Sequence, residues 1–202
     1  MNSVKRICIV CEGFEECDYF RKLINIGVFH NEYKFELINA KSISNIFPRY
    51  QYRFNTNRDH AILIFCDTDK SPYSQYQLLL GKLEGLHGAD VSEKVIIYAN
   101  PCTMQIVLSH FGNIKLVSQS KNTNAPIIES LTGITGYDAS EEQRQQLFSL
   151  VKRDNYSVMK ETDCMYKVDY KILSSSNIGY FLKKFEAPDI SWIQEINDLI
   201  NI

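Results

Sequence analysis

Two apolar runs that each end in acidic residues constrain this chain more than any other feature. Residues 6–10 come shortly before Glu12, and residues 61–66 precede Asp67 and Asp69. Both runs have the length and the β-branched content of buried strands. A carboxylate at the end of a buried strand is unfavourable in its ionised form unless a cation or a basic group lies beside it. We therefore expect Glu12, Asp67 and Asp69 to form one site.

The geometry of a parallel sheet would bring these three acids together. Side chains two residues apart on an extended segment face the same way, so Asp67 and Asp69 form a pair of oxygen ligands. Ligands of open parallel α/β sheets bind beyond the carboxyl ends of the strands, and in one common strand order the first and third strands flank the crevice. With residues 33–40 as the second strand, Glu12 follows the first strand and Asp67 ends the third. Because Mg²⁺ often takes only one or two protein carboxylates, three suffice for Mg²⁺ or Mn²⁺.

The remaining pattern predicts an α/β fold with a mostly parallel sheet flanked by helices. Residues 95–98 form a fourth apolar run, and helical spacing recurs over 14–24 and 76–86. We assign residues 1–120 to this core. Residues 121–202 contain helix-capping residues before three stretches and predict a mainly helical C-terminal subdomain packed on the core. The polar segment 118–124 is expected to be a loop at the boundary.

The acidic residues belong to a wider motif, which consists of Val10, Cys11, Glu12, Gly13, Glu16, Tyr19, Phe20, Asp67, Thr68 and Asp69. This motif resembles the TOPRIM domain, the metal-binding module of topoisomerases, primases and OLD-type nucleases. Residues 99–102, with His110 and Phe111 after them, are similar to the Asn-Pro block of the RloB-like branch, small proteins linked to restriction and phage-defence loci. The chain departs from that block at Thr103, Met104 and Ile106, where the family carries an aromatic residue, a glutamate and then a tryptophan.

The resemblance implies a TOPRIM-like Rossmannoid core that binds Mg²⁺ or Mn²⁺, with Glu12 as general acid or base and Asp67 and Asp69 as metal ligands. Glu16 is a further candidate ligand. Its alternative role, shared with Glu15, is an exposed first helical turn favoured by the helix dipole. His110 is a candidate for phosphate contact or proton transfer, and its alternative is a hydrogen-bonded core histidine. The simpler alternative for Asp67 or Asp69 is to cap the next helix.

The carboxylates predict a metal-dependent nuclease, and the resemblance implies that it cleaves RNA such as tRNA, or DNA, in prokaryotic phage defence. A separate ATPase is a candidate partner by analogy with the family. Two alternatives remain open on the sequence. One is a primase-like or nucleotidyl-transfer enzyme that uses the same carboxylates, and the other is a non-catalytic adaptor for an ATPase.

The segment 41–58 contains no acidic residue and interleaves Arg49, Arg53 and Arg58 with aromatic residues. Guanidinium groups can clamp phosphates and aromatic faces can stack on unpaired bases, so this segment is a candidate nucleic-acid surface. Its alternative is a connecting helix whose aromatic residues pack on the sheet. Further candidate nucleic-acid contacts near the same edge are Lys70, Asn100 and Lys121.

Composition limits the classes of partner. The 202-residue chain has a formal net charge of -2, so a polyanion must be bound by a local basic patch or through a metal ion. Most of the six cysteines lie in apolar patterns and predict buried thiols in a reducing, cytoplasmic setting, rather than disulfides or a zinc site at Cys8 and Cys11. No apolar run approaches the ~20 residues that are needed to span a bilayer, so we expect no membrane contact. The sequence leaves it undecided whether the protein forms a homo-oligomer.

Overall fold

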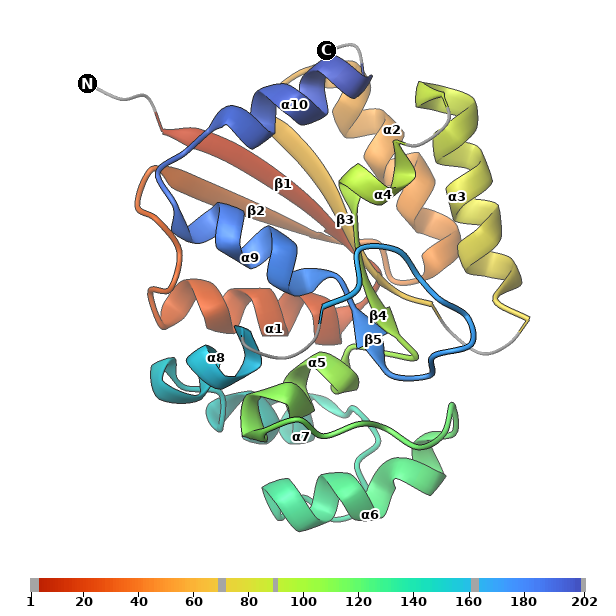
Figure 1. Cartoon of the computed structure of the whole chain (residues 1–202), viewed down its shortest axis with the longest axis vertical. Coiled ribbons are helices and arrows are strands. Elements are labelled where there is room, and N and C mark those ends of the chain that lie inside the picture. Colours follow the sequence, from red (N-terminus) through yellow and green to blue (C-terminus); the bar gives the residue numbers. More distant parts are fainter. Residues whose placement is uncertain (1–3, 69–71, 89–90, 161–163, 201–202) are drawn as a thin grey trace.

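Five strands form one sheet in the order β2-β1-β3-β4-β5 (Figure 1). The computed structural model describes residues 4–68, 72–88, 91–160 and 164–200. The strands are β1 (Lys5–Cys11), β2 (Tyr33–Asn39), β3 (Ala61–Asp67), β4 (Ile96–Asn100) and β5 (Ser175–Ser176). The first four are parallel, and β5 pairs antiparallel with β4. The predicted α/β class and the mostly parallel sheet are confirmed.

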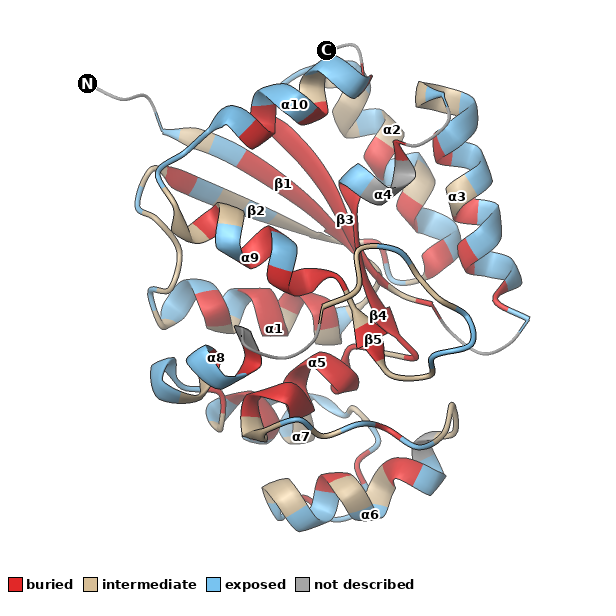
Figure 2. Ribbon diagram, in the orientation of Figure 1, coloured by how far each residue is buried: buried red, intermediate tan, exposed pale blue. Residues whose placement is uncertain are grey.

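The two strands that carry the acidic ends are neighbours at the centre of the sheet. Ile9 pairs with Leu63 and Cys11 with Phe65, so β3 continues two residues beyond the end of β1, to Asp67. Both strands are buried on both faces, as their continuous apolar runs require (Figure 2). The backbone amide of Glu12 then donates to the Phe65 carbonyl oxygen at 2.9 Å. The first and third strands therefore flank the edge at which the acids were predicted.

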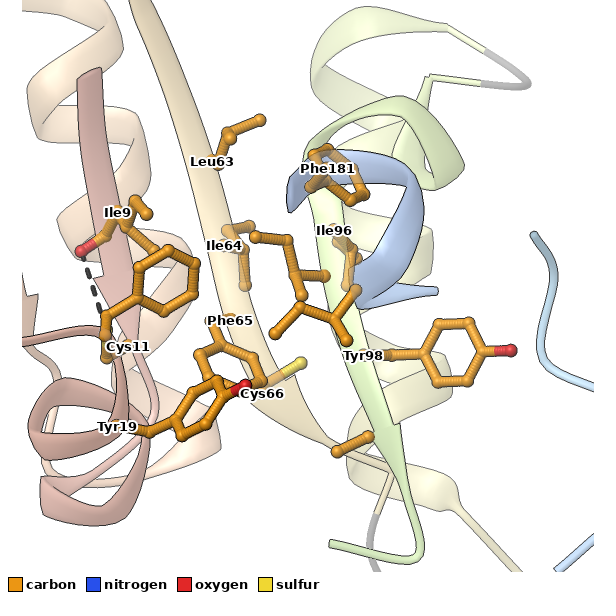
Figure 3. Packing of buried hydrophobic residues seen from close by; sticks show 14 of the residues in the cluster. Ile9, Cys11, Tyr19, Leu63, Ile64, Phe65, Cys66, Ile96, Tyr98 and Phe181 are labelled. Atoms are coloured by element: carbon orange, nitrogen blue, oxygen red, sulfur yellow. Dashed lines mark hydrogen bonds between the residues drawn. The ribbon is translucent and has the colours of Figure 1, made fainter. Parts of the chain in front are cut away.

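Helices cover both faces of the sheet. On one face lie α1 (Phe14–Asn25), α9 (Ile178–Glu186) and α10 (Ser191–Ile200). On the other lie α2 (Ile46–Thr56) and α3 (Ser74–His87). On the first face the ring of Phe20 lies 5.5 Å from that of Phe65, and Figure 3 shows Tyr19 of the same helix beside Phe65. The core is therefore built from aromatic and branched side chains on both sides of β1 and β3.

Most of the remaining helices lie beyond the carboxyl edge of the sheet or near α1, whereas α4 (Ser92–Val95) directly precedes β4 at the opposite edge (Figure 1). The others are η1 (Ile43–Asn45), α5 (Met104–Leu108), η2 (Ser109–Phe111), α6 (Lys121–Thr132), α7 (Glu141–Ser149) and α8 (Arg153–Lys160). The segment 118–124 is not a loop throughout, because α6 begins at Lys121. Asn124 fixes this start, since its Oδ1 accepts from the amides of Val117 and Ser118.

The second half of the chain is mainly helical, and it also completes the sheet. β5 extends the sheet beside β4, and α9 and α10 belong to the layer that covers it. One continuous hydrophobic core contains Ile9 and Phe65 together with Phe185 and Trp192. All six cysteines are free thiols. Within the described ranges, no helix has the length and apolar character needed to cross a membrane.

Candidate active site

A cavity of about 630 Å³ opens at the carboxyl edge of the sheet. Its wall is formed by the ends of β1, β2 and β3 and by segments that precede α1, α6 and α7. Four carboxylates and two cationic side chains line it, namely Glu12, Glu15, Glu16, Asp67, Lys41 and Arg144. Acidic groups thus outnumber basic ones around this hollow.

Glu12 and Asp67 lie together, at the edge where the sequence predicts them. Oε2 of Glu12 accepts a hydrogen bond from the backbone amide of Asp67 at 3.1 Å. Burial raises the pKa of Asp67 well above its ordinary value, and the nearby charges of Glu16 and Glu12 raise it further. Asp69 and Lys70, the other two candidates on this connection, lie outside the described residues.

Glu16 is buried, so the alternative of an exposed first helical turn is wrong for this residue. Its Oε2 accepts from the backbone amide of Gly13 at 2.7 Å, half of a capping box at the start of α1. Its Oε1 accepts from the Thr103 hydroxyl at 2.7 Å. Burial raises the pKa of Glu16 as well. Glu15 instead accepts a hydrogen bond from the Tyr137 hydroxyl at 2.8 Å.

Thr103 joins Glu16 to Asp67. Its Oγ1 lies 2.7 Å from Oε1 of Glu16 and 2.9 Å from Oδ1 of Asp67, and its backbone amide donates to the same Asp67 oxygen at 2.7 Å. A hydroxyl has one hydrogen and can donate to only one carboxylate. The second short contact is favourable only when the other carboxyl group holds a proton. The raised pKa of both acids is consistent with one proton shared in this network.

His110 lies in the core and not at the cavity. It is 1% exposed, and its Nε2 lies 2.9 Å from the hydroxyl of Tyr19. Burial lowers the pKa of His110 to about 4, so the ring is neutral near pH 7. The predicted contact with a phosphate is therefore wrong, and the alternative of a hydrogen-bonded core histidine describes this residue.

The three predicted arginines do not reach the cavity. Arg53 forms paired hydrogen bonds with Asp59 at 2.8 and 2.9 Å and with Glu36 at 2.7 and 2.8 Å. It thereby neutralises the buried Asp59 and is not available as a phosphate clamp. Arg49 and Arg58 are exposed, on α2 and just beyond its end.

Of the two remaining nucleic-acid candidates, Asn100 lies in the core and Lys121 is the first residue of a helix beside the cavity. Asn100 is fully buried, accepts from the Thr68 hydroxyl at 2.8 Å and donates to the Ile172 carbonyl at 2.7 Å, so it holds the end of β4 and does not face a substrate. Lys121 begins α6 between Ser120 and Asn122, which both line the cavity.

Thr103 and Arg144 are site residues that the sequence did not single out as such, whereas Lys41 is the first basic residue of the candidate nucleic-acid segment 41–58. Lys41 directly follows the end of β2 and its backbone has φ 70°, with its amide donating to Oδ1 of Asn39 at 2.7 Å. Arg144 lies on α7 and donates to Asp18 at 2.9 Å. Position beyond a strand end was a signal for Lys41. Nothing in the local pattern indicated Arg144, because α7 reaches α1 only through tertiary packing.

The donors at this edge are oxygens, which suits a hard divalent cation. Over the ranges that the structure describes, no group of three or more His, Cys, Asp or Glu side chains is arranged to hold a metal ion. Mg²⁺ needs only one or two protein carboxylates when waters and substrate complete its shell, and Glu12 and Asp67 supply two. The chain matches no protein-family model, no curated protein sequence and no solved structure.

Proposed function

We propose that this protein is a Mg²⁺- or Mn²⁺-dependent nuclease that hydrolyses phosphodiester bonds in RNA such as tRNA, or in DNA. The observation that carries the proposal is the contact between Glu12 and Asp67 beside a cavity lined by two further acids. Several carboxylates at one water-accessible edge repel each other, and a divalent cation relieves that repulsion. Phosphate oxygens can share such a cation with the protein.

Glu12 and Asp67 are the residues that would hold the cation. When bound, the cation would draw charge from the phosphate and lower the pKa of attacking water. Asp67 then acts in its ionised form, with the Thr103 hydroxyl donating to it. In that arrangement Glu16 holds the shared proton, and its carboxyl group donates a hydrogen bond to Thr103 Oγ1 across the 2.7 Å contact between Oε1 and Oγ1.

Two proton movements complete a hydrolysis. Attacking water must lose a proton, and Glu12 at the cavity wall is the candidate base. The leaving oxygen must gain one, and water in the open cavity can supply it, because Gly13 and Thr103 hold both carboxyl oxygens of Glu16. Lys41 and Arg144 are placed to bind the phosphates on either side, since both line the same cavity.

The biological setting proposed here is phage defence with a separate ATPase partner, which rests on the resemblance to RloB-like TOPRIM proteins alone. A primase-like nucleotidyl transfer would use the same carboxylates, and a non-catalytic adaptor would use none of them. Assays of nucleic-acid cleavage and of pyrophosphate release distinguish the nuclease, the nucleotidyl transferase and the adaptor, which would show neither activity.

The test measures cleavage of labelled total tRNA and plasmid DNA with Mg²⁺, Mn²⁺ or EDTA. We expect cleavage with either metal, loss of cleavage in EDTA, and a drop of at least ~100-fold in Asp67→Asn, as for removal of one essential electrostatic group. Asp154→Asn, an exposed aspartate on α8, is the matched control and keeps full activity. Pyrophosphate release from nucleotides without cleavage would instead support nucleotidyl transfer. Equal cleavage by wild type and Asp67→Asn would contradict the proposal.

A further inference from the structure

Phe14 is an aromatic residue on the surface beside the candidate site. Helical spacing placed it on the apolar face of its helix, but it is the first residue of α1 and 59% exposed, while Glu16 points inward. The Gly13 amide and the Thr103 hydroxyl bind the buried Glu16 carboxyl group. Because Phe14 and Glu16 point to different sides of α1, burial of Glu16 leaves Phe14 exposed to solvent. More than half of this residue is therefore open to solvent next to four carboxylates, which makes it a candidate contact for a ligand of the cavity.

A guanidinium group lies against this ring. The central carbon of the Arg144 guanidinium is 5.1 Å from the centroid of Phe14. Arg144 is itself fixed, because it donates to Asp18 at 2.9 Å and to the Ala139 carbonyl at 2.5 Å. With Arg144 on one side and more than half of the residue exposed, the ring is held in place and still offers aromatic surface to a ligand.

Phe14 and Arg144 separate two hollows of similar size. The first is the acidic cavity of about 630 Å³. The second, of about 640 Å³, is lined by Arg21 and Lys22 and also by Asp18 and Glu141, and Arg21 pairs with Asp18 at 2.6 Å. Phe14 and Arg144 line both. The Phe14 ring therefore lies between the acids and the two basic side chains of α1, next to the route of a chain that extends from one hollow to the other.

We propose that an unpaired base of single-stranded nucleic acid stacks on Phe14, while its backbone runs from the acidic cavity toward Arg21 and Lys22. This inference deepens the proposed nuclease function and rests on it. Bases stack on aromatic and guanidinium faces, and the Phe14–Arg144 pair supplies both. A base inside a duplex has no free face to offer, so the site selects single strands over duplexes.

The test uses short single-stranded RNA and DNA that carry the fluorescent base 2-aminopurine at successive positions. Stacking on an aromatic ring quenches this base, so the readout does not depend on cleavage. Binding is measured with Ca²⁺ for wild type, Phe14→Leu and Phe14→Trp. Leu keeps an apolar side chain and removes the aromatic face, whereas Trp keeps the face. Tyr180→Leu, at an exposed aromatic residue on α9 that lines neither hollow, is the matched control.

We expect quenching at one position of the single strand in wild type, Phe14→Trp and Tyr180→Leu. In Phe14→Leu the quenching disappears and affinity falls about tenfold, in the range known for loss of one base–aromatic stack. Equal quenching in Phe14→Leu, equal quenching of a duplex, or equally tight binding of the free 2-aminopurine nucleotide would overturn the inference.

Failure of this inference is distinguishable from failure of the proposed function. If wild type cleaves with Mg²⁺ while Phe14→Leu keeps its KM and its quenching, the stacking inference is wrong and the nuclease stands. If no nucleic acid is cleaved but quenching still depends on Phe14, the nuclease is wrong and the binding site stands.

Discussion

The backbone amide of Asp67 donates a hydrogen bond to Oε2 of Glu12 at 3.1 Å, which ties the end of β3 to the residue after β1. These positions are 55 residues apart in the chain. Parallel pairing of β1 with β3 brings them to one edge, and Thr103 then adds Glu16 to the same group. The resulting acidic cluster is the basis of the proposed chemistry.

Thr103 is predicted to stabilise the fold through its hydroxyl. In Thr103→Val the shape is kept, but Glu16 and Asp67 lose the hydroxyl group between them. Loss of a hydrogen-bond partner for buried polar groups costs about 1–3 kcal/mol. We expect the free energy of unfolding, measured in urea without divalent cations, to fall by this amount. Thr103→Ser retains the hydroxyl and is the matched control, and equal stabilities of the two variants would show that the hydroxyl contributes nothing.

Arg53 is predicted to be structural and to have no part in nucleic-acid binding. The Asp59 side chain is 1% exposed and pairs with Arg53 at 2.7 Å. Removing one partner of a buried ion pair leaves an uncompensated charge and costs about 3–5 kcal/mol. Arg53→Met should therefore lower the free energy of unfolding by this amount, and Asp59→Asn added to it should restore part of the loss. Arg49→Met, at an exposed position of the same helix, should change stability by less than about 0.5 kcal/mol. Comparable stabilities for Arg53→Met and Arg49→Met would contradict this assignment.

His110 is predicted to make the fold sensitive to acid. Burial lowers its pKa to about 4, whereas the unfolded chain has the ordinary value of 6.5, so the unfolded state binds more protons between these values. The stabilisation from the neutral ring is fully present above pH 6.5 and is lost as the pH falls toward 4. It amounts to at most roughly 3 kcal/mol.

The measurement is the thermal midpoint of His110→Gln and wild type from pH 7.5 to 4. We expect wild type to lose more stability than the variant over this range. His30→Gln, at a half-exposed histidine, is the control and should follow wild type. Parallel curves for His110→Gln and wild type would mean that the ring titrates in the folded protein as it does in the unfolded chain.

The sequence predicted the central strands well because their signal is local. Buried parallel strands are continuous apolar runs, and residues 5–11 and 61–67 show this plainly. β5 was missed because Ser175 and Ser176 carry no apolar pattern and form a strand only by pairing with β4. Pairing of that kind depends on the folded chain, so a local pattern does not reveal it.

The candidate site shows the same division between local and tertiary signals. Position after a strand identified Glu12 and Asp67. Helical periodicity over 14–24 does not show that Phe14 is exposed and Glu16 buried, because the hydroxyl that binds the Glu16 carboxylate is distant in the chain. Thr103 lies just beyond β4. It can join Glu16 to Asp67 only because the folded chain brings α1, β3 and the end of β4 together.

The most direct test of the central claim is binding of Mn²⁺ to the purified protein, followed by electron paramagnetic resonance and by thermal unfolding. We predict saturable binding by wild type and by Asp154→Asn, and loss of it in Glu12→Gln and Asp67→Asn. At a free Mn²⁺ concentration 100 times the Kd, wild type should gain about 2.7 kcal/mol of stability. A wild-type protein whose stability is indifferent to Mn²⁺, or an Asp67→Asn variant that binds it as tightly, would contradict the claim that these carboxylates form a cation site.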